Sequence, residues 1–141
     1  MRDIRAQSIE LVHEFGRAWE RCDIDAILGM LAPDAVYQNV PVPAMVGRDA
    51  IRRFITPNLK LAERTIWEFL ATEADAEGKR VLTERVDSFV FPEGTVAAPV
   101  MGIFEIENGL IARWRDYCDL GTFVRDMQAI GRMPGPGIKK T

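Results

Sequence analysis

Apolar residues recur at helical spacing through the first half of the chain. From Ile4 to Cys22 they share one face of a helix whose other face is rich in Glu and Arg, which predicts an amphipathic helix. A second helical pattern follows Asp23, which can cap it, and is predicted to end near Pro33. A third begins at Gly47, and we expect it to end at the Thr56–Pro57 step, because proline disfavours helical backbone in the residue before it.

The second half of the chain changes to the period of two that is typical of strands. A short extended segment, AVYQNVPVP, precedes the third helix. Four long extended runs are predicted, at 64–75, 79–91, 95–107 and 110–118. Among the turns between them, Asn108-Gly109 is the strongest hairpin signal, since both residues tolerate the positive φ of a two-residue turn. A last helix is predicted at 122–130, with Asp119 as its cap.

Helices followed by a meander of long strands indicate an α+β fold. We expect the helices to pack into the concave face of a bent antiparallel sheet, which leaves an internal pocket. Residues 1–131 would form this domain. The segment 132–141 is rich in Pro and Gly and is expected to be a tail without regular structure.

Composition narrows the class of protein. The net charge of −3, with lysines and arginines scattered along the chain, offers no basic stripe for nucleic acid. No apolar run is long enough to span a membrane, and the charged start MRDIRAQSIE lacks the apolar core of a signal peptide, so a cytoplasmic protein is expected. Cys22 and Cys118 are far apart and lack a CxxC neighbour, which favours free thiols and, with the single His13, argues against a zinc site.

Three pairs of residues, each spaced two apart, provide the candidate chemistry, because side chains at this spacing lie on one face of a strand, about 7 Å apart. The pairs are Tyr37/Asn39, Arg85/Asp87 and Trp114/Asp116. Each has an ordinary structural interpretation. Tyr37 would pack its ring and Asn39 would form a turn. Arg85 and Asp87 would be a solvated ion pair, and Asp116 would be a carboxylate at a sheet edge or in a loop. If Asp116 lies on an apolar face instead, its charge is costly unless something pairs with it or uses it.

Taken together, YQNVPVP, GRDAI, TERVD and WRDY resemble limonene-1,2-epoxide hydrolases in their order and separations. The resemblance extends from about residue 8 to about residue 126 and is specific because several segments match at once. It implies the cone-shaped α+β fold of ketosteroid isomerase and nuclear transport factor 2-like proteins, with a mixed sheet, and a homodimer. It also implies water addition to an epoxide, giving a vicinal diol, without metal, cofactor or covalent intermediate.

The family's catalytic set falls on five positions of this chain, with none missing: Tyr37, Asn39, Arg85, Asp87 and Asp116. By resemblance, Asp116 is the base, Asp87 the acid and Arg85 the bridge between them, while Tyr37 and Asn39 position the water. Opening an epoxide with water requires a base and an acid at once. Two aspartates and one arginine carry −1 when all are ionised, so a dry site favours one added proton. Holding an Asp protonated at pH 7 needs a pKa raised by about 3 units, or about 4 kcal/mol.

Apolar neighbours of these residues are expected to line the pocket: Phe89, Ala98, Val100, Trp114 and Cys118. Such a lining favours a bulky apolar epoxide of the terpenoid, steroid or lipid class. A covalent route would need a histidine beside an attacking aspartate, but His13 is predicted on the solvated face of the first helix. Two alternatives stay open. One is an isomerase or cyclase on the same cone, which would not need Arg85 between two aspartates; the other is a ligand-binding protein whose polar cluster contributes only specificity.

Overall fold

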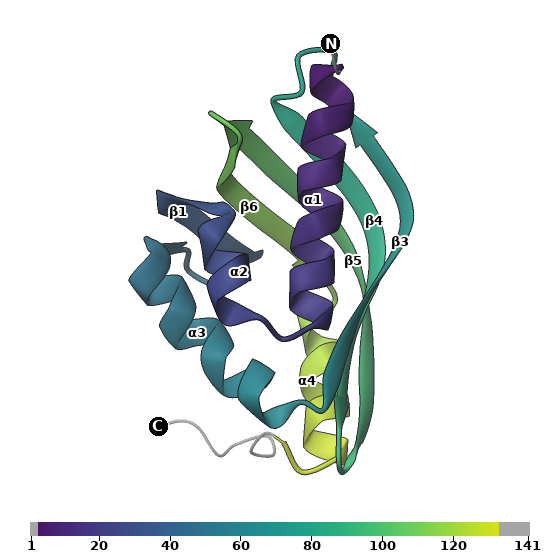
Figure 1. The fold of residues 1–141 in the computed structure, drawn as a ribbon. Coiled ribbons are helices and arrows are strands. Elements are labelled where there is room, and N and C mark those ends of the chain that lie inside the picture. The colour runs from purple at the N-terminus through teal and green to yellow at the C-terminus, as the bar shows by residue number, and fades with distance from the viewer. Residues whose placement is uncertain (1–2, 133–141) are drawn as a thin grey trace.

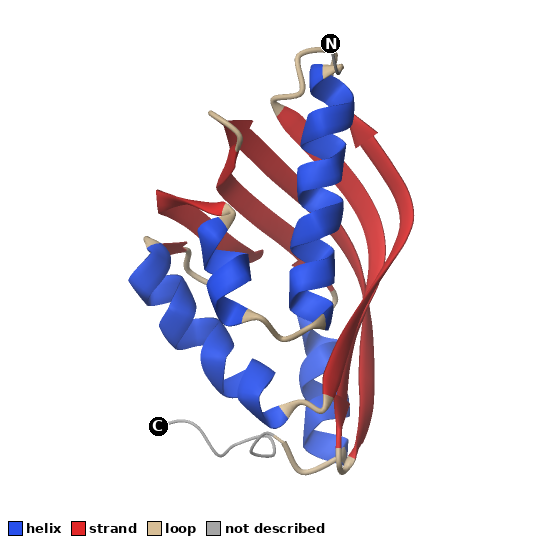
Figure 2. Cartoon of the chain, viewed as in Figure 1, coloured by secondary structure: helices blue, strands red, loops and turns tan. Residues whose placement is uncertain are grey.

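The computed structural model of the protein describes residues 3–132, in which four helices pack on a six-stranded sheet (Figures 1 and 2). The elements in chain order are α1 (Ile4–Glu20), α2 (Ile24–Gly29), β1 (Leu31–Val40), β2 (Met45–Val46), α3 (Arg48–Leu61), β3 (Arg64–Ala74), β4 (Arg80–Phe91), β5 (Gly94–Glu107), β6 (Leu110–Cys118) and α4 (Leu120–Ala129). Apart from Arg132, the predicted tail lies outside the described residues. No helix in the described part of the chain is long and apolar enough to cross a lipid bilayer.

The sheet has the strand order β2-β1-β6-β5-β4-β3 and is mixed. Strands β3 to β6 form an antiparallel meander, as predicted. Strand β1 instead runs parallel to β6, so the expectation of a purely antiparallel sheet is wrong, whereas the mixed sheet implied by the family resemblance is confirmed. The sheet curves around α1, and α2 and α3 lie over β1 on the same side (Figure 1).

Local signals fixed most element boundaries. Asp23 caps α2 and accepts a hydrogen bond from the backbone N–H of Ala26 at 3.1 Å. Asp119 caps α4 in the same way and accepts a hydrogen bond from the backbone N–H of Thr122 at 3.0 Å. The hairpin between β5 and β6 turns at Asn108 and Gly109, whose φ values are 52° and 74°. These three predictions are confirmed. The second helix ends at Gly29, before the predicted Pro33, which lies in β1.

Helix α3 continues to Leu61, so the prediction that it ends at Thr56–Pro57 is wrong. Pro57 removes one backbone N–H from the helix. Ile55 and Leu59, on either side of the proline, are both buried, so packing stabilises the turns before and after it. The extra turn matters for the site, because it carries Asn58 to the pocket described below.

Helix α1 packs along the concave face of the sheet through an aromatic core. Phe15 is fully buried and meets Trp67, Phe104 and Trp114 edge to face, with centroid distances of 5.8, 6.0 and 4.9 Å. Such contacts add to the free energy of burial by about 0.5–1.5 kcal/mol each. The core therefore fills the part of the concave face under α1.

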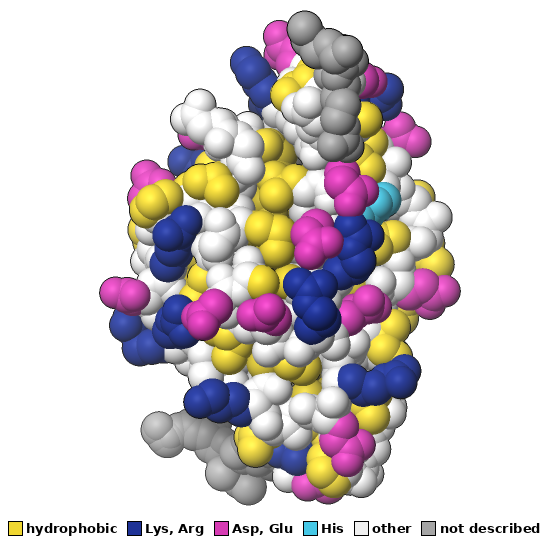
Figure 3. Space-filling model, viewed as in Figure 1, with side chains coloured by type: hydrophobic (Ala, Val, Ile, Leu, Met, Phe, Trp, Pro, Cys, Tyr) yellow, Lys and Arg dark blue, Asp and Glu magenta, His cyan; other side chains and the backbone are white. Residues whose placement is uncertain are grey.

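The outer face of α1 carries alternating charges (Figure 3), with Arg17 paired to Glu14 at 2.8 Å. His13 differs from expectation. Its Nε2 lies 3.0 Å from Thr72 Oγ1, and its ring packs against Phe69 at 4.6 Å, so the histidine is half-buried against β3 and only partly solvated. Burial lowers the pKa of His13, and its side chain is not part of the lining of the central pocket.

Candidate active site

The predicted polar pairs meet on the concave face because of the strand registers. Asn39 on β1 is the partner of Asp116 on β6, and Tyr37 is the partner of Trp114. On the other side of β6, Asp116 is paired with Gly102 of β5, which is in turn paired with Thr83 of β4. Residues that are distant in sequence thus lie in neighbouring positions across four strands.

Arg85 holds the two aspartates together from beneath. Its side chain is fully buried, and its guanidinium donates to both oxygens of Asp87, from Nε at 2.9 Å and from Nη2 at 2.7 Å. The same Nη2 donates to Asp116 Oδ2 at 3.0 Å. A solvated ion pair is therefore the wrong interpretation of Arg85 and Asp87. The planar fork of arginine suits such a bridge, since it fixes the positions of both carboxyl groups.

Asp116 is 6% exposed and lies inside β6, flanked by two strands, so the interpretation as an edge or loop carboxylate is wrong. Its Oδ1 accepts a hydrogen bond from the indole Nε1–H of Trp114 at 2.9 Å, while its Oδ2 accepts from Arg85. Each oxygen therefore has one donor and keeps a second lone pair for a proton or a water.

Burial raises the pKa of both carboxyl groups. Hydrogen bonding to Arg85 and its positive charge oppose the pKa shift of both groups, and at Asp116 the negative charge of Asp87 adds to the effect of burial. Burial alone would lower the pKa of Arg85, but the charges of Asp116 and Asp87 outweigh it, so its pKa is raised and the guanidinium stays charged. One cation between two buried acids favours a shared proton, because the cluster is then neutral.

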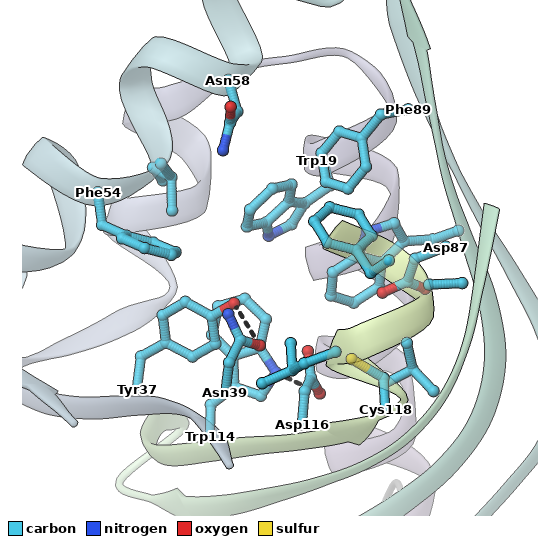
Figure 4. Close-up of a pocket in the computed structure, with 16 residues that line it drawn as sticks. Trp19, Tyr37, Asn39, Phe54, Asn58, Asp87, Phe89, Trp114, Asp116 and Cys118 are labelled. Atoms are coloured by element: carbon cyan, nitrogen blue, oxygen red, sulfur yellow. Dashed lines mark hydrogen bonds between the residues drawn. The ribbon is translucent and has the colours of Figure 1, made fainter. Parts of the chain in front are cut away.

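Tyr37 and Asn39 lie beside Asp116 and face the pocket (Figure 4). The Tyr37 hydroxyl donates to Asn39 Oδ1 at 3.1 Å, which leaves the hydroxyl oxygen as an acceptor and the Asn39 amide nitrogen as a donor. The Tyr37 ring also stacks on Trp114 at 3.8 Å, and the backbone carbonyl of Asn39 accepts a hydrogen bond from the backbone N–H of Val42, so the structural interpretations of these residues hold as well. Burial raises the pKa of Tyr37 well above its usual value and keeps the phenol neutral.

Three further residues support the site without having been singled out in the sequence. The Thr83 hydroxyl accepts a hydrogen bond from Arg85 Nη1 at 3.0 Å, and the ring of Trp67 lies 4.1 Å from the guanidinium carbon. Gly102 provides space, since a Cβ there would lie 2.5 Å from Asp116 Oδ1 and closer still to Arg85 Nη1. Thr83 shares a strand face with Arg85 and could have been found. The role of Gly102 depends on the register across three strands and leaves no local signal.

The polar cluster opens into a cavity of about 110 Å³. All five predicted lining residues border it: Phe89, Ala98, Val100, Trp114 and Cys118. The helices complete the wall in a way that the sequence did not predict, with Trp19 from α1, Phe54 and Asn58 from α3, and Phe123 from α4. Within residues 3–132, no three His, Cys, Asp or Glu side chains are placed so that they could hold a metal ion, and both cysteines are free thiols, as predicted.

Comparisons with known proteins decide the family. The profile described as the limonene-1,2-epoxide hydrolase catalytic domain matches residues 6–129. The chain belongs to the limonene-1,2-epoxide hydrolase family. It is 33% identical to epoxide hydrolase EphG of Mycobacterium tuberculosis over 131 residues, which cover 92% of this chain and 86% of that protein. The enzyme is therefore an epoxide hydrolase of this type, as the sequence motifs predicted.

Solved structures agree with the family and with the fold. The structure of an M. tuberculosis LEH-like epoxide hydrolase superposes with a TM-score of 0.71 at 31% identity, covering 89% of this chain and 92% of that one. A hypothetical protein with a ketosteroid isomerase-like fold from Catenulispora acidiphila gives a TM-score of 0.71 at 19% identity, covering 82% of this chain and 90% of that one. This second likeness concerns the fold alone and confirms the predicted cone.

Proposed function

We propose that the enzyme adds water directly to an apolar epoxide in one concerted step, with Asp116 as the base and Asp87 as the acid. The observation that carries the proposal is the position of Arg85, which is hydrogen-bonded to two buried carboxyl groups at one end of a pocket. Ring opening requires a group that removes a proton from water and another that delivers one to the departing oxygen. A pair of acids sharing one proton supplies both.

The assignment of the two roles follows from their neighbours. Asp116 lies next to Asn39 across the β1–β6 ladder, so it adjoins the groups proposed to hold the water. Asp87, on β4, is bound to the guanidinium of Arg85 by two hydrogen bonds, from Nε and Nη2. The water would then lie beside Asp116 and the departing oxygen beside Asp87. An oxygen of Asp87 can carry the proton on the lone pair that Arg85 does not use.

Tyr37 and Asn39 would position the nucleophilic water. The hydroxyl oxygen of Tyr37 can accept from the water and the amide of Asn39 can donate to it, because the bond between the two side chains leaves these groups available. A third contact, to Asp116, would take the proton that is removed. Fixing the water in this way lowers the entropic part of the barrier.

The cavity narrows the substrate class. A volume of about 110 Å³ is small beside the roughly 300–1,000 Å³ of pockets that enclose drug-sized ligands. We therefore expect a compact terpenoid epoxide to be enclosed. A steroid or lipid epoxide would insert its oxirane end between Phe89, Ala98 and Val100, with the remainder extending out of the mouth.

A panel of epoxides tests this function. Cyclohexene oxide, limonene 1,2-epoxide and a steroid epoxide would be incubated with the enzyme, and the diols quantified by chiral gas chromatography. We expect diol from limonene 1,2-epoxide, with a higher kcat/KM than for the steroid. Absence of diol from every compound, with binding retained, would instead favour a ligand-binding protein; isomerised ketone or allylic alcohol would favour an isomerase.

A homodimer is also part of the proposal. Leu82, Met101 and Tyr117 are exposed on the strands of the meander, and the last two are direct partners in the β5–β6 ladder. They alternate with the residues of the site, so they occupy the opposite, convex face of the sheet. Light scattering after size exclusion should give twice the mass of 15.9 kDa for the wild type. Met101→Lys should reduce it to the monomer mass, and a monomeric wild type would exclude the dimer.

A further inference from the structure

We propose that the pocket contains a second polar subsite, formed by Trp19 and Asn58, which binds a neutral hydrogen-bond acceptor on the substrate away from the oxirane. The preferred substrate is then an oxygenated epoxide, such as a keto- or hydroxy-terpenoid, and not a plain hydrocarbon epoxide. This inference rests on the proposed function and deepens it. Figure 4 shows both residues across the pocket from Tyr37, Asn39 and Asp116.

Trp19 provides a buried donor without a partner. The residue is 5% exposed, and it lines the cavity. Among the residues that the structure describes, Trp19 Nε1 is the one buried side-chain nitrogen or oxygen atom without a hydrogen-bond partner. The indole nitrogen of Trp114, by contrast, donates to Asp116. Buried polar groups in proteins nearly always have a partner, so an unpaired donor at a pocket wall indicates that the ligand supplies it.

The Trp19 indole is held in a fixed orientation. Its ring stacks on Trp67 with a centroid distance of 5.5 Å and a tilt of 22°, and it meets Trp114 edge to face at 5.8 Å. In Figure 4 the indole nitrogen faces the interior of the pocket. A donor fixed in this way loses little conformational entropy on binding, which favours recognition of an acceptor at one position.

Asn58 provides the second polar group of the subsite. It lies in the last turns of α3, lines the same cavity, and points its amide into it (Figure 4). Its neighbours on this wall, Phe54 and Ile55, are apolar. The side chain is exposed, which places the amide at the mouth of the pocket, within reach of the end of a ligand whose oxirane lies at the carboxyl groups.

The chemistry of the two groups defines the class of acceptor. An indole is a donor only, and an amide can donate through its nitrogen, so both suit a carbonyl, ether or hydroxyl oxygen. Neither carries a charge. Arg85, the cation that binds the two aspartates of the pocket, is fully buried beneath them. The subsite therefore favours a neutral oxygen over a carboxylate.

An isosteric pair of substrates tests the subsite. In limonene 1,2-epoxide the ring carries an isopropenyl group; in 4-acetyl-1-methylcyclohexene 1,2-epoxide an oxygen replaces the terminal CH₂ of that group. The readout is the ratio of kcat/KM for the acetyl compound to that for the isopropenyl compound. A neutral hydrogen bond changes affinity by roughly two- to tenfold, and the acetyl oxygen can accept one bond from each of the two residues, so we expect a wild-type ratio of about ten or more.

Matched variants assign the effect to the two residues. Trp19→Phe keeps an aromatic ring and removes the N–H, and Asn58→Leu keeps the size and removes the amide. Each should lower the ratio by roughly threefold or more. Phe123→Leu, which alters an apolar part of the same lining, should leave the ratio unchanged. A wild-type ratio near one, or a ratio that neither polar variant lowers, would overturn the inference even if both epoxides are hydrolysed.

A second readout is independent of catalysis. In ¹H–¹⁵N spectra the indole signal of Trp19 can be assigned by its loss in Trp19→Phe. We expect the diol of the acetyl compound to move this signal downfield and the diol of limonene 1,2-epoxide to leave it near its free position. Binding of both diols without this difference would contradict the subsite. If the shift occurs but neither epoxide is hydrolysed, the subsite stands and the proposed hydrolysis fails.

Discussion

Gly102 faces Asp116 across the β5–β6 ladder, and the missing side chain of the glycine makes room for the Asp116 carboxyl group. A Cβ at this position would lie 2.5 Å from Asp116 Oδ1, which is well inside van der Waals contact, and it would also meet Arg85 Nη1. The contact between Asp116, the proposed base, and Arg85 therefore depends on a glycine in a third strand.

Gly102→Ala should disturb the arrangement of Asp87, Asp116 and Arg85 more than it lowers the stability of the fold. The added methyl group has to displace Arg85, Asp116 or both, and overpacking of this kind costs about 1–3 kcal/mol. We expect kcat to fall by at least about tenfold and the pH profile of kcat/KM to change, because the distances from the guanidinium to the two carboxyl groups change. Steady-state kinetics and thermal unfolding would measure both effects.

Gly121→Ala is the control, since a Cβ there would meet its nearest neighbours at 3.4 Å. It should leave the pH profile unaltered. A Gly102→Ala enzyme that unfolds at a lower temperature but keeps the wild-type pH profile would show that the glycine serves packing only.

Asp116→Asn should remove the proposed base while preserving the size of the side chain. We expect kcat to fall by about 10²- to 10⁴-fold, with a smaller change in affinity for the diol. Asp119→Asn, three residues away, keeps the cap of α4, because Asn caps helices as well as Asp. This control should retain wild-type kcat. A fully active Asp116→Asn enzyme would exclude the proposed base.

Arg85→Lys should separate charge from geometry. Lysine keeps the positive charge but cannot contact Asp87 through two parallel bonds and Asp116 at once. Weakening a buried ion network costs up to about 3–5 kcal/mol when a partner is lost, so both unfolding temperature and kcat should fall. Arg115→Lys alters a partly exposed pair with Glu105 and should change neither. Equal effects of the two substitutions would contradict the bridging role.

The pH dependence of activity follows from the raised pKa values of Asp87 and Asp116. At low pH the pair takes up a second proton and the base is lost. At high pH the last proton leaves and the acid is lost. The profile of kcat/KM against pH should therefore be bell-shaped. Both limbs should lie at higher pH than expected for two solvated aspartates, whose pKa is about 3.9. A profile that is flat from acid to neutral pH would contradict a proton-sharing pair.

The same pKa shift has a defined sign in the free energy of unfolding. A carboxyl group whose pKa is raised by folding stabilises the native state most when it is protonated, below its unfolded pKa, and this contribution is lost as the pH rises through the folded value. Asp116→Asn removes that titration. The variant should therefore gain stability relative to the wild type as the pH rises. Urea unfolding at several pH values would show it, and a difference that is constant with pH would contradict the shift.

Local signals in the sequence were enough for most of the fold. The Asn108-Gly109 turn and the caps at Asp23 and Asp119 each act through neighbouring residues, so their effect is visible in a short segment. The end of α3 was missed for the opposite reason. Pro57 is a local helix breaker, but burial of Leu59 against distant residues outweighs it.

The candidate site was predictable only in part. The two-residue spacing predicted that Arg85 and Asp87 share one face of a strand, and likewise Trp114 and Asp116. Each pair alone, however, is also consistent with a purely structural role. Their meeting depends on the registers of β4, β5 and β6, and spacing within one strand does not contain that information. The family motifs supplied it. Gly102, Trp19 and Asn58 were not singled out, because their importance arises from elements that approach only in the folded chain.

The central claim is that water attacks the epoxide directly and that no ester forms on an aspartate. A single turnover with enzyme in excess, in water enriched in ¹⁸O, tests it by mass spectrometry of both product and protein. Direct attack predicts one labelled oxygen in the diol of the first turnover and no label in Asp87 or Asp116. Unlabelled diol in that turnover, with ¹⁸O found in either aspartate, would contradict the mechanism.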